Sequence, residues 1–157
     1  MSRRYLAAAT LSAMLCLGAC QTAPAAPDFS MAETTMREYF LALSQGRYAD
    51  AVARYSGVYD EPLIRMNPDI DPADRARLFE RYCTQNGGVC LPVKDVIRTQ
   101  PADIGFIFTV HFANPDGSTF AQGPCCGETK GEPITEFDVL VSTIGDESVL
   151  TLPPYVP

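Results

Sequence analysis

Residues 104–112 read IGFIFTVHF, and this stretch decides the fold. Apolar side chains recur at every second position, namely Ile104, Phe106, Phe108, Val110 and Phe112. Successive side chains of a β-strand point to opposite faces, so the alternation predicts a strand with one buried face and one more polar face. Other elements must therefore cover the buried face.

Segments of strand character flank this stretch on both sides. The turn signals Asn114–Gly117 and Gly145-Asp146 separate two pairs of them. We expect further strands over 91–98, 118–122, 134–143 and 148–152, the last one ended by Pro153-Pro154. Short connections of this kind favour an antiparallel meander.

The apolar spacing before residue 90 is that of helices. Met36, Tyr39, Phe40 and Leu43 recur at intervals of three or four. We expect helices over 30–45, 48–56 and 72–85, the last capped by Asp71.

Residues 58–70 contain two prolines, and we expect them to be irregular. About three helices packed on a curved antiparallel sheet of four to five strands is an α+β pattern. The chain from 30 to 157 is long enough for a single domain of this kind.

The first nineteen residues have the layout of a secretory signal peptide. Arg3 and Arg4 precede an uncharged, largely apolar run over 5–17. This run is shorter than the roughly 20 apolar residues that cross a membrane as a helix. We therefore expect residues 1–19 to be removed.

Cys20 follows that run directly. The sequence Leu17-Gly18-Ala19-Cys20 resembles the lipobox of bacterial lipoproteins, in which the cysteine is lipidated and becomes the new N-terminus. The resemblance implies cleavage before Cys20 and anchoring by acyl chains such as palmitate, with Gln21 typical of sorting to an outer membrane where one exists. The alternative is an ordinary signal peptide in which Cys20 stands by chance.

Residues 20–29 include a Pro/Ala-rich run and are expected to form a flexible tether. We therefore expect a bacterial cell-envelope protein whose domain faces the periplasm or the exterior.

Charge excludes one class of partner. Removal of residues 1–19 leaves 10 Lys and Arg against 19 Asp and Glu, a net charge of −9. An acidic surface argues against nucleic acid and against electrostatic docking on anionic lipid. We expect the membrane to be contacted through the lipid.

Four cysteines remain besides Cys16 and Cys20: Cys83, Cys90, Cys125 and Cys126. An even number outside the cytosol favours disulfides. Adjacent cysteines bond to each other poorly, so Cys83 and Cys90 are each expected to bond to one member of the pair 125–126. Two alternatives are a zinc site, which the spacing fits poorly, and a redox role of Cys125 and Cys126.

The helical segment carries a family resemblance. The pattern Tyr39-Phe40-x-Ala42-Leu43-x-x-Gly46-x-Tyr48-x-x-Ala51, followed by a third helix and long strands, resembles nuclear-transport-factor-2-like (cystatin-like) domains. This likeness implies a cone that can enclose a ligand. The segment from Phe108 to Tyr155 is also similar to bacterial secreted proteins, a likeness that implies no activity.

Four residues are pocket candidates: Tyr39, Tyr55, His111 and Asp138. His111 is the only histidine, and Asp138 on a neighbouring strand could tune it for proton transfer, as enzymes of the resembled family do. The alternatives are a surface histidine beside an acid, and tyrosines that belong to the core.

We expect no metal site, since Asp69, Asp71 and Asp74 lack the spacing of a calcium loop. No cofactor motif is present either. The sequence therefore predicts a membrane-anchored protein without catalytic activity that binds a small apolar ligand or an envelope protein. The alternatives are an isomerase-like or dehydratase-like enzyme using His111 with an acid, and a thiol-redox protein.

Overall fold

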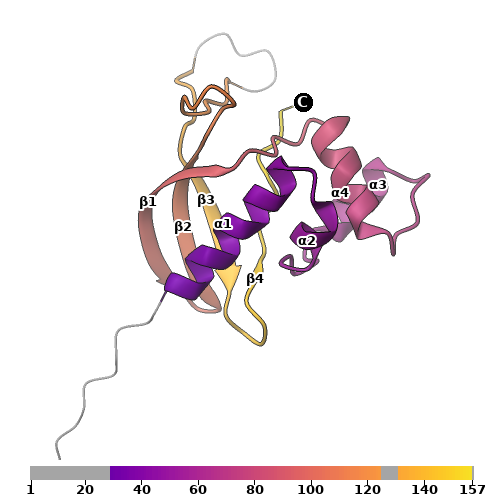
Figure 1. Ribbon diagram of the computed structural model, residues 1–157, viewed down its shortest axis with the longest axis horizontal. Coiled ribbons are helices and arrows are strands. Elements are labelled where there is room, and N and C mark those ends of the chain that lie inside the picture. The colour runs from indigo at the N-terminus through magenta and orange to yellow at the C-terminus, as the bar shows by residue number, and fades with distance from the viewer. Residues whose placement is uncertain (1–28, 125–130, 157) are drawn as a thin grey trace, which may run out of the picture.

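The computed structural model describes residues 29–124 and 131–156. Their helices are α1 (Ser30–Ser44), α2 (Tyr48–Val52), α3 (Asp60–Met66) and α4 (Arg75–Thr84). Their strands are β1 (Val93–Ala102), β2 (Gly105–Phe112), β3 (Phe137–Ser142) and β4 (Ser148–Val149). The strands pair antiparallel in the order β1-β2-β3-β4, so helices packed on a four-stranded antiparallel sheet confirm the predicted α+β class (Figure 1).

The alternation predicted for residues 104–112 is present in β2. Phe106, Phe108, Val110 and Phe112 are buried, whereas His111 is partly exposed. Gly105 is required at the start of the strand because a Cβ there would lie 2.0 Å from the Val141 carbonyl oxygen. This close approach lets β2 pair with β3 from its first residue.

Helix α1 covers the buried face of the sheet (Figure 1). Met36, Tyr39, Phe40 and Leu43, spaced at three and four, are buried on one side of the helix. The Phe40 ring packs edge-on against Phe112 of β2, with 4.9 Å between ring centroids. The core therefore lies between α1 and the sheet.

The segment expected to be irregular contains α3. Pro62 lies in the first turn of this helix, where a backbone N–H has no partner within the helix, so proline is tolerated there. Asp60 and Glu61 in the first turn and Arg65 in the last also suit the helix dipole. The expectation of an irregular segment is wrong here because the proline lies at the helix start.

Helix α4 begins three residues later than predicted. Asp74, rather than Asp71, caps it and accepts a hydrogen bond from the Arg77 N–H at 3.1 Å. Asp71 instead accepts one from the Ala73 N–H in the preceding turn.

Two of the predicted strands pair over fewer residues than expected. Residues 118–122 make only isolated bridges, Ala113 with Thr119 and Gln122 with Ile134. The strand expected over 148–152 is limited to Ser148–Val149, because Thr151 Oγ1, rather than a backbone carbonyl, accepts the Leu140 N–H. The sheet has four strands, within the predicted four to five.

Candidate functional site

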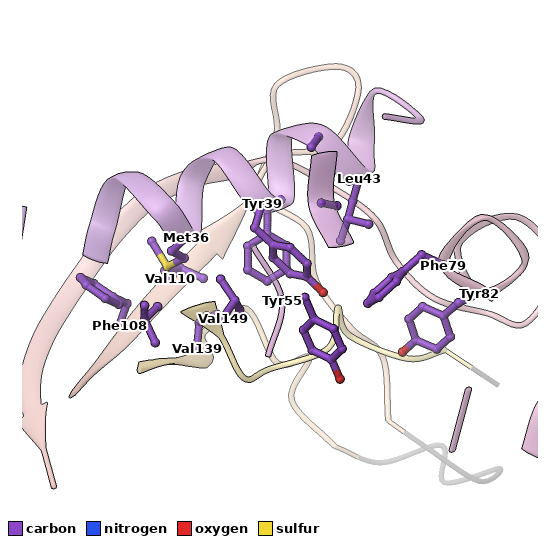
Figure 2. Close-up of a cluster of buried hydrophobic side chains, with 14 of the residues drawn as sticks. Met36, Tyr39, Leu43, Tyr55, Phe79, Tyr82, Phe108, Val110, Val139 and Val149 are labelled. Carbon is purple, nitrogen blue, oxygen red and sulfur yellow. The ribbon is translucent and has the colours of Figure 1, made fainter. Parts of the chain in front are cut away.

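The tyrosine candidates belong to the core. Tyr39 is fully buried, and its ring stacks on Tyr55 with 6.0 Å between centroids. Figure 2 shows Tyr39 pointing from α1 toward Tyr55, with Phe79 beside them. Burial raises the pKa of Tyr39 well above its ordinary value and that of Tyr55 to about 12, so both phenols stay protonated at neutral pH.

The side chains between the helices and the sheet fill the space in which a cone would hold a ligand. Six large ones are almost completely buried there: Tyr39, Phe40, Leu43, Phe79, Phe108 and Phe112. They make edge-on ring contacts, such as Tyr39 with Phe79 at 6.2 Å between centroids. Tyr39 and Tyr55 therefore belong to the packed core.

His111 and Asp138 lie on the opposite, outer face of the sheet. The nearest acid to His111 is Asp95 of β1, with 3.7 Å between Nδ1 and Oδ2. Asp138 instead accepts a hydrogen bond from Thr109 Oγ1 at 2.7 Å. The structure thus does not join the predicted pair.

A polar row crosses this outer face. Arg98 of β1 donates a hydrogen bond to Thr109 Oγ1 of β2 at 3.1 Å, and Thr109 donates in turn to Asp138 of β3. The row explains why Thr109 is buried although it points away from α1. It links three strands through side-chain hydrogen bonds.

Cys83 and Cys90 form a disulfide with each other. The expectation that each bonds to one member of the pair 125–126 is therefore wrong. Gly87, at a φ of 82°, helps reverse the chain after α4, so the two Cα atoms lie 5.5 Å apart. Cys125, Cys126 and Cys20 lie outside the described residues. The redox hypothesis concerns Cys125 and Cys126 and therefore stays a prediction.

The C-terminal segment is held against the chain that follows α4. The Val156 N–H donates to the Gly87 carbonyl at 2.8 Å, and the Val89 N–H donates to the Pro154 carbonyl at 2.7 Å. The buried Tyr82 hydroxyl donates to the Pro153 carbonyl at 2.9 Å. A Cβ at Gly87 would lie 2.2 Å from the Val156 carbonyl oxygen, so the glycine permits this contact.

A surface depression of about 440 Å³ lies beside this segment. We call it the distal depression; it is lined by Met66, Gln85, Asn86, Gly87, Tyr155 and Val156. The side chains of Met66, Tyr155 and Val156 are exposed, and the Oδ1 atom of Asn86 is buried without a hydrogen-bond partner. A buried acceptor of this kind is costly to leave unpaired.

The exposed apolar side chains of the distal depression can cover an apolar group. Sequence reasoning missed it because its residues come from three separate parts of the chain. Asn86-Gly87-Gly88 and Pro153-Pro154 signalled only the ends of elements.

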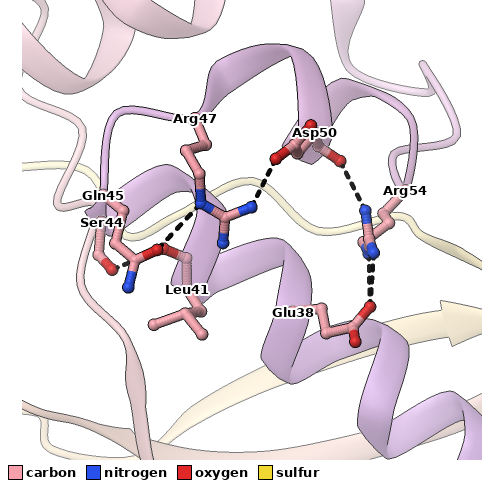
Figure 3. A network of polar contacts seen from close by, with 7 residues as sticks. All are labelled: Glu38, Leu41, Ser44, Gln45, Arg47, Asp50 and Arg54. Carbon is pink, nitrogen blue, oxygen red and sulfur yellow. Dashed lines mark hydrogen bonds and ion pairs between the residues drawn. The ribbon is translucent and has the colours of Figure 1, made fainter.

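A second depression, of about 470 Å³, lies between α2 and the start of α4. Its charged residues already have partners, since Arg47 pairs with Asp50 and Arg77 with Glu80. Figure 3 shows Arg47 paired with the Asp50 carboxylate, and Arg54 donating to the Glu38 carboxylate of α1 and to the Asp50 backbone carbonyl. Exposed pairs of this kind contribute little to stability.

The described part of the chain also bears on metal sites and membrane-spanning helices. Residues 29–124 and 131–156 contain no cluster of three or more His, Cys, Asp or Glu side chains arranged to hold a metal. None of the helices α1–α4 has the length and apolar character needed to cross a bilayer. No protein-family model, curated protein or solved structure matches the chain.

Proposed function

We propose that the protein is a lipid-anchored domain of the bacterial cell envelope that binds another envelope protein. The lipobox-like stretch 17–20 supports the anchor. Helix α1 on one face of a bent antiparallel sheet, with α2–α4 grouped beside it, supports a nuclear-transport-factor-2-like arrangement (Figure 1). The domain then faces the periplasm or the exterior.

One observation carries the binding mode: the interior is filled by the protein's own side chains. Phe40 of α1 and Phe108 and Phe112 of β2 occupy the region between α1 and the sheet and are almost inaccessible to solvent. An enclosed apolar ligand needs a cavity of several hundred Å³. Binding at the surface, to a protein, is the mode that a filled interior supports.

The distal depression is the place we propose for this contact. Its three exposed apolar side chains fit a protein segment that presents apolar side chains. The proton-transfer alternative requires His111 and an acid inside a pocket. His111 instead lies beside Asp95 on the outer face of the sheet, so we do not favour it.

The anchor is tested by feeding labelled palmitate to cells that make the protein. We expect wild type to carry the label and Cys20→Ala to lose it and to keep a longer, unprocessed N-terminus. Unlabelled wild type that migrates like Cys20→Ala would refute the anchor.

The binding mode is tested by native mass spectrometry of protein purified from its own membrane. We expect a complex with a second protein and no bound small molecule. Val156→Asp, in the distal depression, should abolish the complex, whereas the matched control Val58→Asp, at an exposed valine elsewhere, should retain it. A stoichiometric apolar molecule, or equal behaviour of the two variants, contradicts the proposal.

A further inference from the structure

The end of the domain at which α1 begins carries exposed apolar side chains. Met31 and Ile144 have the largest exposed fractions among the large apolar residues described, 68% and 67%, and Phe29 is 46% exposed. We call these three residues the tether-end rim. Scattered apolar residues are common on protein surfaces, but a group at one end indicates a contact.

The three residues come from two segments that meet at this end. The Phe29 ring packs edge-on against Phe106 of β2, and Phe106 pairs with Val141 near the end of β3. Ile144 lies in the turn that follows β3, and its N–H donates to Ser142 Oγ. Figure 1 shows the start of α1 and the β3–β4 turn at the same end of the molecule, away from the C-terminus.

A short length of chain joins this end to the proposed anchor. Position 29 follows position 20 by nine residues, which span at most about 30 Å when fully extended. Helix α1, with 15 residues, is itself roughly 22 Å long. A bilayer that holds Cys20 is therefore within reach of the rim.

We propose that the tether-end rim rests on the surface of the bilayer that holds the acylated Cys20, and so orients the domain. This inference depends on the proposed lipid anchor. With the rim on the membrane, the distal depression, which lies near the C-terminus, points away from the bilayer toward a partner.

Charge decides which lipid surface fits. Asp103 and Asp146, in the turns at the same end, are both exposed. Anionic headgroups would repel these carboxylates. The rim therefore fits a zwitterionic surface such as phosphatidylcholine, into whose interface apolar and aromatic side chains partition.

The chain has no tryptophan, so single tryptophans report on position without background. The full lipidated protein is placed in phosphatidylcholine vesicles as Met31→Trp, Ile144→Trp and the control Tyr155→Trp, which replaces an exposed residue near the opposite end. We expect brominated acyl chains to quench the emission of the two rim tryptophans several-fold more than that of the control. Equal, weak quenching in all three variants overturns the rim contact.

The same experiment also distinguishes the absence of a rim contact with the bilayer from the absence of the lipid anchor. Intact mass establishes whether Cys20 carries acyl chains in the protein that is measured. If it does not, the anchor is refuted, and a Cys20→Ala protein held to nickel-chelating lipid by an N-terminal histidine tag still tests the rim. A second outcome also overturns the proposal. If the protein dimerises, the emission of the rim tryptophans is shifted to the blue in the absence of vesicles, and brominated lipid does not quench it, then a second copy of the protein covers the rim.

Discussion

The two faces of β2 differ in chemistry although their residues alternate along one strand. Phe106, Phe108, Val110 and Phe112 are buried beneath α1, whereas Thr109 and His111 make polar contacts on the other face. An antiparallel sheet can be covered on one face only, and here the covered face supplies most of the core. The inner face therefore supplies most of the stability of the fold, and the outer face contributes less.

The largest effect is expected from a truncation on the inner face. Phe108→Ala leaves a cavity among side chains that are completely buried, and should lower the free energy of unfolding by about 3–5 kcal/mol. Urea denaturation measures the loss. His111→Ala on the outer face of the same strand is the control and should cost less than about 0.5 kcal/mol. Equal losses of unfolding free energy in the two variants would contradict the larger contribution of the inner face.

Removal of the disulfide should have the next largest effect on stability. It closes a loop with a sequence separation of seven, which corresponds to about 2.5 kcal/mol in the chain-entropy model. The double variant Cys83→Ser/Cys90→Ser should lose roughly that amount relative to oxidised wild type. Disulfide mapping of the oxidised protein should find Cys83 and Cys90 in one cross-linked pair. A bond from either residue to Cys125 or Cys126 would contradict the pairing.

The polar row on the outer face should contribute less than the core. Thr109→Val keeps the shape but removes the hydroxyl that donates to Asp138 and accepts from Arg98, with an expected loss of about 1–2 kcal/mol. Thr143→Val, at an exposed threonine after β3, is the matched control and should be nearly neutral. If the two variants behave alike, the row does not stabilise the sheet.

The smallest effect concerns the buried phenol of Tyr39. Its hydroxyl has no hydrogen-bond partner, so Tyr39→Phe should leave stability at pH 7 unchanged or slightly higher. Tyr55 differs because its hydroxyl oxygen accepts the Tyr59 N–H at 2.8 Å, and Tyr55→Phe should cost about 1 kcal/mol. A clear loss in Tyr39→Phe would indicate a partner for that hydroxyl.

Stability at alkaline pH tests the raised pKa values of Tyr39 and Tyr55. Folding raises the pKa of both tyrosines, so the folded state favours the protonated phenol. This contribution is fully present below about pH 10 and is lost as the pH rises through about 12. The free energy of unfolding of wild type should therefore fall more steeply over this range than that of Tyr55→Phe. Parallel curves would contradict the raised pKa.

Much of the fold could be predicted from local patterns. The alternation over 104–112 and the helical spacing of Met36, Tyr39, Phe40 and Leu43 identify the two surfaces that form the core. Each pattern needs only the geometry of its own element. The α+β class follows from their order along the chain.

The remaining errors concern position within an element or contacts between distant segments. Pro62 indicated a break, although it lies in the first turn of α3, where proline is tolerated. The pairing of Cys83 with Cys90 depends on the reversal near Gly87, which the cysteine count does not reveal. The distal depression likewise requires Met66, Asn86 and Val156 to meet in space.

The protein's own side chains fill the interior between α1 and the sheet. Crystals of wild type under xenon pressure test it most directly, because xenon enters apolar cavities that side chains leave empty. We predict no xenon among Phe40, Phe108 and Phe112 in wild type, and xenon at the vacated ring position in Phe112→Ala. Xenon in the wild-type interior would reveal a ligand cavity and contradict the account.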